Sequence, residues 1–176
     1  MSIVQVNQVF LGVDQGIANC GYAFIQATKN GLHLLSSGTI KTPAKTPSHT
    51  RVYTIFCLLE EYCSIYKPII MGGELLMFSP PRKSGGNESA SMMTVNLVSG
   101  ALCVLAAKQG IDYKEYIPGS IRKTVTGKGK ATQQELKEVL SSLINKKRFS
   151  KHELDAVAIA VHLEKKYREE REEKND

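Results

Sequence analysis

The stretch QVFLGVD at residues 8–14 decides the architecture, because it reads as a short buried strand that ends in the carboxylate of Asp14. Gly16 stops this apolar run. Two further runs rich in strand-forming residues, 21–27 and 32–40, follow it and are separated by the turn signal KNG. We therefore expect three sequential, antiparallel strands at the start of the fold.

Helix and strand signals alternate over the rest of the chain. Apolar positions recur at helical spacing over 48–66, and Pro68 stops that helix. Two later helices each open with a capping box, TQQE at 132–135 and SKHE at 150–153. The other predicted elements are a strand at 69–71, a loop at 79–88, a helix rich in small residues at 89–108, a strand at 113–117, and a loop formed by Pro118 and the TGKGK segment. This βββαβαβαα order favours an α/β fold with helices on both faces of one sheet.

Length and composition restrict the class of protein. The 176 residues are 42% hydrophobic and 23% charged, which fits one globular domain and argues against disorder or a fibrous repeat. We place the domain at 1–163 and expect 164–176 to form a charged helical extension or tail. No apolar run approaches the length of a membrane span and the first residues lack a signal peptide, so we expect a soluble, cytoplasmic protein. The four cysteines form no C-x-x-C pair and are expected to be reduced.

The net charge of +6 is concentrated in one segment. Residues 119–151 carry nine Lys and Arg residues against two acidic ones. The nine are Arg122, Lys123, Lys128, Lys130, Lys137, Lys146, Lys147, Arg148 and Lys151. Clustered cations suit a polyanion such as nucleic acid, because neutralising its phosphates releases counterions. A solvated helix face is the alternative interpretation.

Three acidic residues stand in apolar surroundings, where an unpaired charge is unfavourable. Asp14 and Glu74 end apolar runs, and Asp155 lies within LDAVAIA, whereas Glu115 is expected in solvent. His152 precedes Asp155 by three residues and shares its helix face near a helix N-terminus. We predict that these four side chains converge on Mg²⁺ or Mn²⁺. In the alternative, Asp14 caps a turn, Glu74 pairs with a lysine and His152 is an ordinary polar helix residue.

The order and spacing of several motifs resemble the RuvC family of Holliday-junction resolvases, over roughly residues 8–163. The motifs are LGVDQG at 11–16, NCGY at 19–22, Glu74, NESA at 87–90, EYIP at 115–118, VTGKGKA at 125–131 and HELDAVAIA at 152–160. The resemblance implies a ribonuclease-H-like fold, in which a five-stranded mixed sheet has helices on both faces.

The resemblance also implies an activity, which is the Mg²⁺-dependent hydrolysis of four-way (Holliday) DNA junctions by paired symmetric nicks. Two Mg²⁺ ions per active site, for which Mn²⁺ could substitute, would be held by Asp14, Glu74, His152 and Asp155. In this mechanism Asp14 bridges both ions, and His152 ligates or orients the attacking water.

The same resemblance assigns DNA contacts and a quaternary structure. Arg122 matches a basic position that contacts the scissile region, and backbone contacts are expected from Lys123, Lys128 and Lys130. The aromatic wedge that enters the open junction would be Phe78, or Met77 by direct count from Glu74. A two-fold symmetric junction calls for a homodimer, with the helix 89–108 as its seam.

Three positions depart from the family pattern. Gln15 stands where the family has proline, Gln133 where it has a second lysine of the catalytic region, and Ser99 where Ala-Arg-Gly is common. Lys128 or Lys130 could supply the missing charge. This divergence suggests a phage or mobile-element member of the family.

Other functions remain possible from the sequence. A broader nuclease of branched DNA and replication forks would share the metal site and differ in the loop 77–88. A non-catalytic junction-binding protein would not need the four filled ligand positions. An actin-like phosphotransferase needs a duplicated domain, for which 176 residues leave no room. A branch-migration helicase partner is not identified by any segment.

Overall fold

The fold is built on one mixed five-stranded sheet. The computed structural model describes residues 7–75 and 88–174, and for residues 88–95 it describes only the backbone of the helix. The strands are β1 (Gln8–Asp14), β2 (Asn19–Thr28), β3 (Gly31–Lys41), β4 (Ile70–Glu74) and β5 (Asp112–Tyr116). Their spatial order is β3-β2-β1-β4-β5, with the first three antiparallel and β1, β4 and β5 parallel. The predicted strand meander and the predicted mixed sheet are both confirmed.

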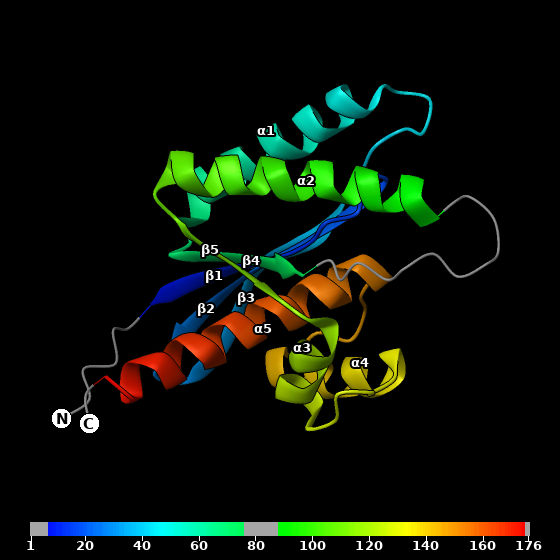
Figure 1. Ribbon diagram of the computed structural model, residues 1–176. Coiled ribbons are helices and arrows are strands. Elements are labelled where there is room, and N and C mark those ends of the chain that lie inside the picture. Colours follow the sequence, from blue (N-terminus) through cyan, green and yellow to red (C-terminus); the bar gives the residue numbers. More distant parts are fainter. Residues whose placement is uncertain (1–6, 76–87, 175–176) are drawn as a thin grey trace.

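Helices cover both faces of this sheet, as predicted (Figure 1). They are α1 (Ser48–Tyr66), α2 (Glu88–Gln109), α3 (Pro118–Thr126), α4 (Gln133–Ile144) and α5 (Lys151–Glu172). The pair α1 and α2 lies on one face, and α3, α4 and α5 lie on the other (Figure 1). Each face buries its own apolar cluster, one containing Leu11 and Phe24 and the other Phe10 and Ile25, because successive strand residues point to opposite faces.

The helix α3 is a correction, because the sequence analysis expected a loop from Pro118 through the TGKGK segment. Pro118 occupies the first helical turn, where its missing N–H removes no intrahelical bond. Gly127 ends the helix in the left-handed conformation, with φ of 79°. Between them Ile121 is buried in the core. Two residues taken as loop signals therefore mark the two ends of a short helix.

Several smaller expectations are also tested by the structure. Both predicted capping boxes form, at the starts of α4 and α5. All four cysteines are free thiols, and two of them, Cys20 and Cys63, are buried. Within the described residues, no helix combines the length and the apolar character that crossing a membrane requires.

Glycines on the sheet let α5 approach the backbone of β1 and β2 directly. A Cβ added to Gly12 would overlap the carbonyl oxygen of Ala156 and lie 2.5 Å from the backbone nitrogen of Ala160. A Cβ added to Gly21 would overlap the carbonyl oxygen of His152. The start of α5 is therefore held at a distance that no larger residue at these two strand positions permits.

This packing predicts that Gly12→Ala destabilises the protein by about 3 kcal/mol, because the obstructing atoms belong to a helix backbone and cannot rotate away. Urea-induced unfolding would measure the loss. The matched control is Gly119→Ala, whose added Cβ meets its nearest neighbour at 3.7 Å, an ordinary contact, so its stability should stay within about 0.5 kcal/mol of wild type. Equal effects of the two substitutions would contradict the argument.

Candidate active site

Three acidic side chains meet at one edge of the sheet. Asp14 and Glu74 end the neighbouring parallel strands β1 and β4, whose register pairs Val13 with Gly73. The carboxyl ends of parallel strands lie at the same edge, which is where α/β sheets bind ligands. Asp155 reaches this edge from α5. The charges of the three carboxylates act on one another at this edge.

His152 lies directly against Asp14. Its Nδ1 is 2.6 Å from Asp14 Oδ2, and the two side chains are 34% and 20% exposed. Burial raises the pKa of the Asp14 carboxyl above its usual value, the hydrogen bond to His152 opposes that rise, and the charge of Asp155 adds to it. The first turn of α5 thus supplies a polar partner to a strand-end carboxylate.

Asp155 is held by a residue that the sequence analysis marked as a departure from the family. The amide nitrogen Nε2 of Gln133 donates to both oxygens of Asp155, at 3.0 and 3.1 Å. Arg122 Nη2 lies 3.9 Å from Asp155 Oδ1, and its Nη1 donates to the carbonyl of Ala131 at 2.8 Å. Gln133 Oε1 is buried and has no hydrogen-bond partner among the described residues. Gln133 is therefore a residue of the site, where it supplies a neutral amide.

Glu74 carries the most perturbed carboxyl of the three. Burial, together with the charges of Asp14 and Asp155, raises its pKa to about 7, and the charge of Arg122 opposes the rise. The backbone N–H of Glu74 donates to Gln15 Oε1 at 3.0 Å. The site therefore concentrates negative charge in a partly dry environment.

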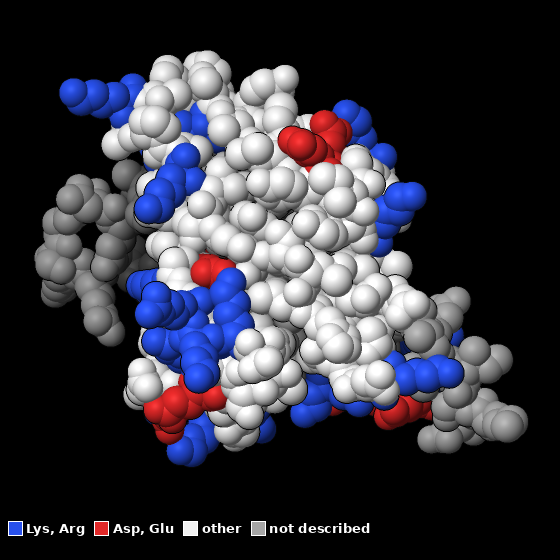
Figure 2. All heavy atoms as spheres, turned by 180° about the vertical axis from the view of Figure 1, so that it is seen from behind, with Lys and Arg blue, Asp and Glu red and all other residues white. Residues whose placement is uncertain are grey.

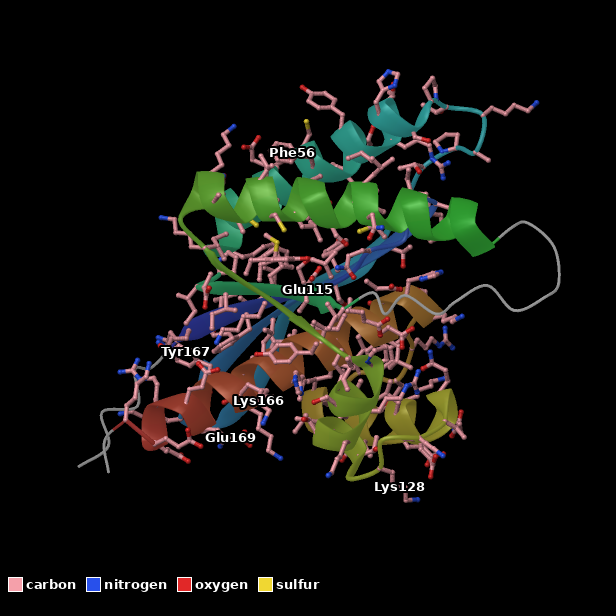
Figure 3. The ribbon with its side chains drawn as sticks, viewed as in Figure 1. Phe56, Glu115, Lys128, Lys166, Tyr167 and Glu169 are labelled. Carbon is pink, nitrogen blue, oxygen red and sulfur yellow. The ribbon has the colours of Figure 1, made fainter. Side chains whose placement is uncertain are left out.

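Gln15 connects the backbone of Glu74 to two other elements. Its Nε2 donates to Ser99 Oγ of α2 at 3.2 Å and to the Tyr113 hydroxyl of β5 at 3.3 Å. Glu115, expected in solvent, is instead partly buried and accepts a 2.9 Å hydrogen bond from that hydroxyl; Figure 3 shows it between the α2 layer and α5. The sequence analysis noted Gln15 only as a departure, and its 2% exposure is the signal of its structural role.

The donor set of the site fits divalent metal ions in its chemistry but, among the described residues, is not arranged around one. Within residues 7–75 and 88–174, no three His, Cys, Asp or Glu side chains stand close enough to hold a metal ion in the conformation described. Asp14 is engaged by His152, and Asp155 by Gln133. The chemistry nevertheless fits, because carboxylates supply the hard oxygen ligands that divalent cations prefer. Burial and neighbouring negative charge raise the pKa values of Asp14 and Glu74, and a bound divalent cation would reverse both effects.

The residues predicted to contact DNA differ in their exposure and in their ion pairing. Lys123 and Lys130 are exposed, whereas Lys128 Nζ is 2.8 Å from Glu135 Oε1 and projects at the edge of the molecule farthest from α2 (Figure 3). The largest group of Lys and Arg side chains seen from behind lies on the side that holds α3, α4 and the start of α5 (Figure 2). Phe78 and Met77, the two candidates for the wedge, lie outside the described residues.

Known proteins resemble this chain over nearly its whole length. Residues 10–162 match the family model described as crossover junction endodeoxyribonuclease RuvC. A protein of that name from Heliobacterium modesticaldum is 32% identical over 155 residues, covering 87% of this chain and 91% of its own. One from Rickettsia prowazekii is 29% identical over 154 residues, covering 86% and 94%.

Solved structures share the fold. Thermus thermophilus RuvC superposes with a TM-score of 0.79 at 23% identity, covering 92% of this chain and 96% of its own. The same protein in complex with Holliday junction substrate gives 0.82 at 22% identity, with the same coverage. A yeast mitochondrial Holliday junction resolvase gives 0.61 at 16% identity, covering 89% of this chain and 79% of its own.

The raised pKa of Glu74 predicts that Glu74→Gln stabilises the ion-free protein at high pH. The pKa of Glu74 is 4.5 in the unfolded chain and about 7 in the folded protein, so between these pH values the folded state binds more protons than the unfolded state. The stability of the wild-type protein therefore falls as the pH rises from 4.5 to about 7, and it stays lower above that pH. We expect a gain on the order of 1 kcal/mol at pH 8 in EDTA, after allowance for solvent screening, and almost none at pH 4. Urea unfolding at both pH values measures it, with the exposed Glu61→Gln as the control. A variant less stable than wild type at pH 8 would refute the assignment.

Proposed function

This chain belongs to the RuvC family of crossover junction endodeoxyribonucleases, and from that premise we propose that it resolves four-way DNA junctions by paired symmetric nicks. The observation that carries the proposal is the meeting of Asp14, Glu74, His152 and Asp155 at one sheet edge, inside the matched residues 10–162. Because chromosomal or mobile-element DNA is the substrate, we also propose a cytoplasmic location.

The nucleases of this family depend on metal ions. We propose two Mg²⁺ ions per site, with Mn²⁺ able to substitute, held by Asp14, Glu74, His152 and Asp155. When bound, such a pair supplies an activated water and charge stabilisation for the leaving 3′ oxygen, so that the product carries a 5′-phosphate. Asp14 is the proposed shared ligand because both its β4 neighbour Glu74 and the α5 side chains surround it.

The protein's own groups prepare this chemistry. The hydrogen bond between His152 Nδ1 and Asp14 Oδ2, 2.6 Å long, orients the imidazole ring. In this orientation the ring is suited to position the attacking water. Gln133 aligns both oxygens of Asp155 without adding charge. Arg122 Nη2 lies 3.9 Å from Asp155 Oδ1, and among the described residues no other Lys or Arg forms an ion pair with Asp14, Glu74 or Asp155. Arg122 is therefore the group best placed to contact the scissile phosphate.

Backbone contacts from Lys123, Lys128 and Lys130 would add affinity without reading sequence. Lys128 is already paired with Glu135, so its contribution requires that exposed pair to open, which takes little energy. Lys123 and Lys130 are exposed without an ion pair in the described part of the chain.

A homodimer is proposed through α2. Leu97 and Val104 are 50% and 61% exposed, and a Cβ added to Gly100 between them would meet nothing within 4 Å. These three residues share one helix face, while Val98 and Leu102 of the same helix are buried in the core. An exposed apolar stripe with a glycine at its centre suits close packing of two helices across a two-fold axis.

The deciding experiment compares a synthetic four-way junction, a three-strand fork and a linear duplex, each with Mg²⁺ and with EDTA. Nicks mapped at nucleotide resolution should be paired, symmetric, metal-dependent and confined to the junction. Equal cutting of the fork would favour the broader branched-DNA nuclease. Tight binding without cutting would reduce the function to junction binding.

Asp14→Asn and Asp155→Asn should each lower the junction cleavage rate by about a hundredfold or more, because an amide is a poor ligand for a hard cation. Junction binding in EDTA should be largely retained, as measured by fluorescence anisotropy. Asp112→Asn is the matched control: this strand carboxylate is 60% exposed and should leave cleavage unchanged. Loss of junction binding by a folded Asp14→Asn protein would count against the assignment.

Val104→Glu should convert the dimer to a monomer, because it places a charge within an apolar seam. Sedimentation velocity at micromolar concentration would show the change in mass. Ile65→Glu is the control, since Ile65 on α1 is also 61% exposed but lies outside the α2 stripe. A dimer that survives Val104→Glu, or one that Ile65→Glu disrupts equally, would refute this seam.

A further inference from the structure

The connection between α4 and α5 carries three consecutive cations. Its sequence is NKKRFS at residues 145–150, and no acidic residue lies between Glu138 and Glu153. It leads directly into the turn of α5 that presents His152 to Asp14. The segment therefore brings positive charge to the border of the candidate active site.

Lys146, the first of the three, is half-buried and neutralised by the buried carboxylate of Glu153. Its Nζ lies 2.5 Å from Glu153 Oε1 and 3.0 Å from Ser37 Oγ of β3. The Ser37 hydroxyl donates to the same carboxylate oxygen at 2.6 Å, and Glu153 is only 8% exposed. A charge buried this deeply needs its partner, so Lys146 serves to balance Glu153.

Both ends of the connection are fixed to the core. Ile144 is buried, and Phe149 packs against the same apolar cluster with the Lys146 ammonium 5.5 Å from its ring centre. The hydroxyls of Ser150 and Thr39 of β3 are 2.7 Å apart. The two residues between these anchors are therefore held in place against the edge strand and the start of α5.

Lys147 and Arg148 are those two residues, and both are exposed. In the described part of the chain no ion pair or side-chain hydrogen bond involves either of them. The view from behind shows Lys and Arg side chains gathered on this side of the molecule (Figure 2). Two free, positioned cations beside a nuclease site match the chemistry of a phosphodiester backbone, which offers anionic oxygens at regular spacing.

We infer that Lys147 and Arg148 form a second DNA-backbone contact, while the adjacent Lys146 is a structural anchor. The inference rests on the proposed function. The first group of cations, at Lys128 and Lys130, precedes α4, and Lys147 and Arg148 follow it. The 12 residues of α4 span about 18 Å, a length over which duplex DNA carries about ten phosphates. The two groups therefore reach different phosphates and together orient one arm of a junction.

The test measures junction affinity in EDTA as a function of salt concentration. Lys147→Ala/Arg148→Ala should lower the slope of log affinity against log salt by about two and weaken binding about tenfold or more near 100 mM salt. Lys29→Ala/Lys165→Ala is the control, because it removes the same charge from exposed residues at the opposite end of the sheet and of α5. This control should leave the slope unchanged.

The neighbouring lysines give the sharper contrast. Lys146→Ala should lower the melting temperature and keep the salt slope, whereas Lys147→Ala should lower the slope by about one and keep the melting temperature. An unchanged slope in the Lys147→Ala/Arg148→Ala protein, or the same response from both single variants, would overturn the inference. Wild-type protein that binds no junction would instead overturn the proposed function, and this inference with it.

Discussion

The contact between the backbone of α5 and the backbones of β1 and β2 is the constraint on which the site depends. It exists because Gly12 and Gly21 offer no side chain where the carbonyl oxygens of Ala156 and His152 sit. At this separation the first turn of α5 lies over the end of β1, and the imidazole of His152 reaches Asp14. A helix lifted by one methyl group on either strand would carry Asp155 away from the carboxylates of the sheet.

The site balances its charge unevenly, which suits it to bind cations. Two of its carboxylates have a side-chain partner, an imidazole for Asp14 and a neutral amide for Asp155, whereas the hydrogen bond between Glu74 and Gln15 is donated by the backbone N–H of Glu74. At Glu74 burial and the charges of Asp14 and Asp155 outweigh the opposing charge of Arg122, so the pKa rises to about 7. The neighbouring Glu153 shows the opposite solution, because Lys146 and Ser37 satisfy it and its pKa is lowered. Different surroundings thus shift the pKa values of these two carboxyls in opposite directions.

Prediction from the sequence succeeded where local signals sufficed. Residues close together in the chain specify the strand at 8–14, both capping boxes and the alternation of helix and strand. The structure confirms all of them. The same local reasoning failed at 118–126, where proline and glycine mark helix ends as well as loops. It also placed Glu115 in solvent, because nothing near it in the chain reveals its contact with Gln15, which is 100 residues away; the hydroxyl of Tyr113, on the same strand, completes this group.

The sequence by itself determined the order of elements, the three carboxylates in apolar surroundings and the family resemblance, because each of these is a pattern of residue types along the chain. Only the tertiary structure decided which groups touch: Gln133 on Asp155, Gln15 between Glu74 and α2, and Lys146 on Glu153 rather than in solvent. The physical reason is that a side chain's partner is set by packing between segments that are far apart in the chain, 84 residues for Gln15 and Ser99 and 138 for His152 and Asp14. The type of a residue determines which hydrogen bonds its side chain can donate or accept, but only the fold brings a donor within reach of an acceptor.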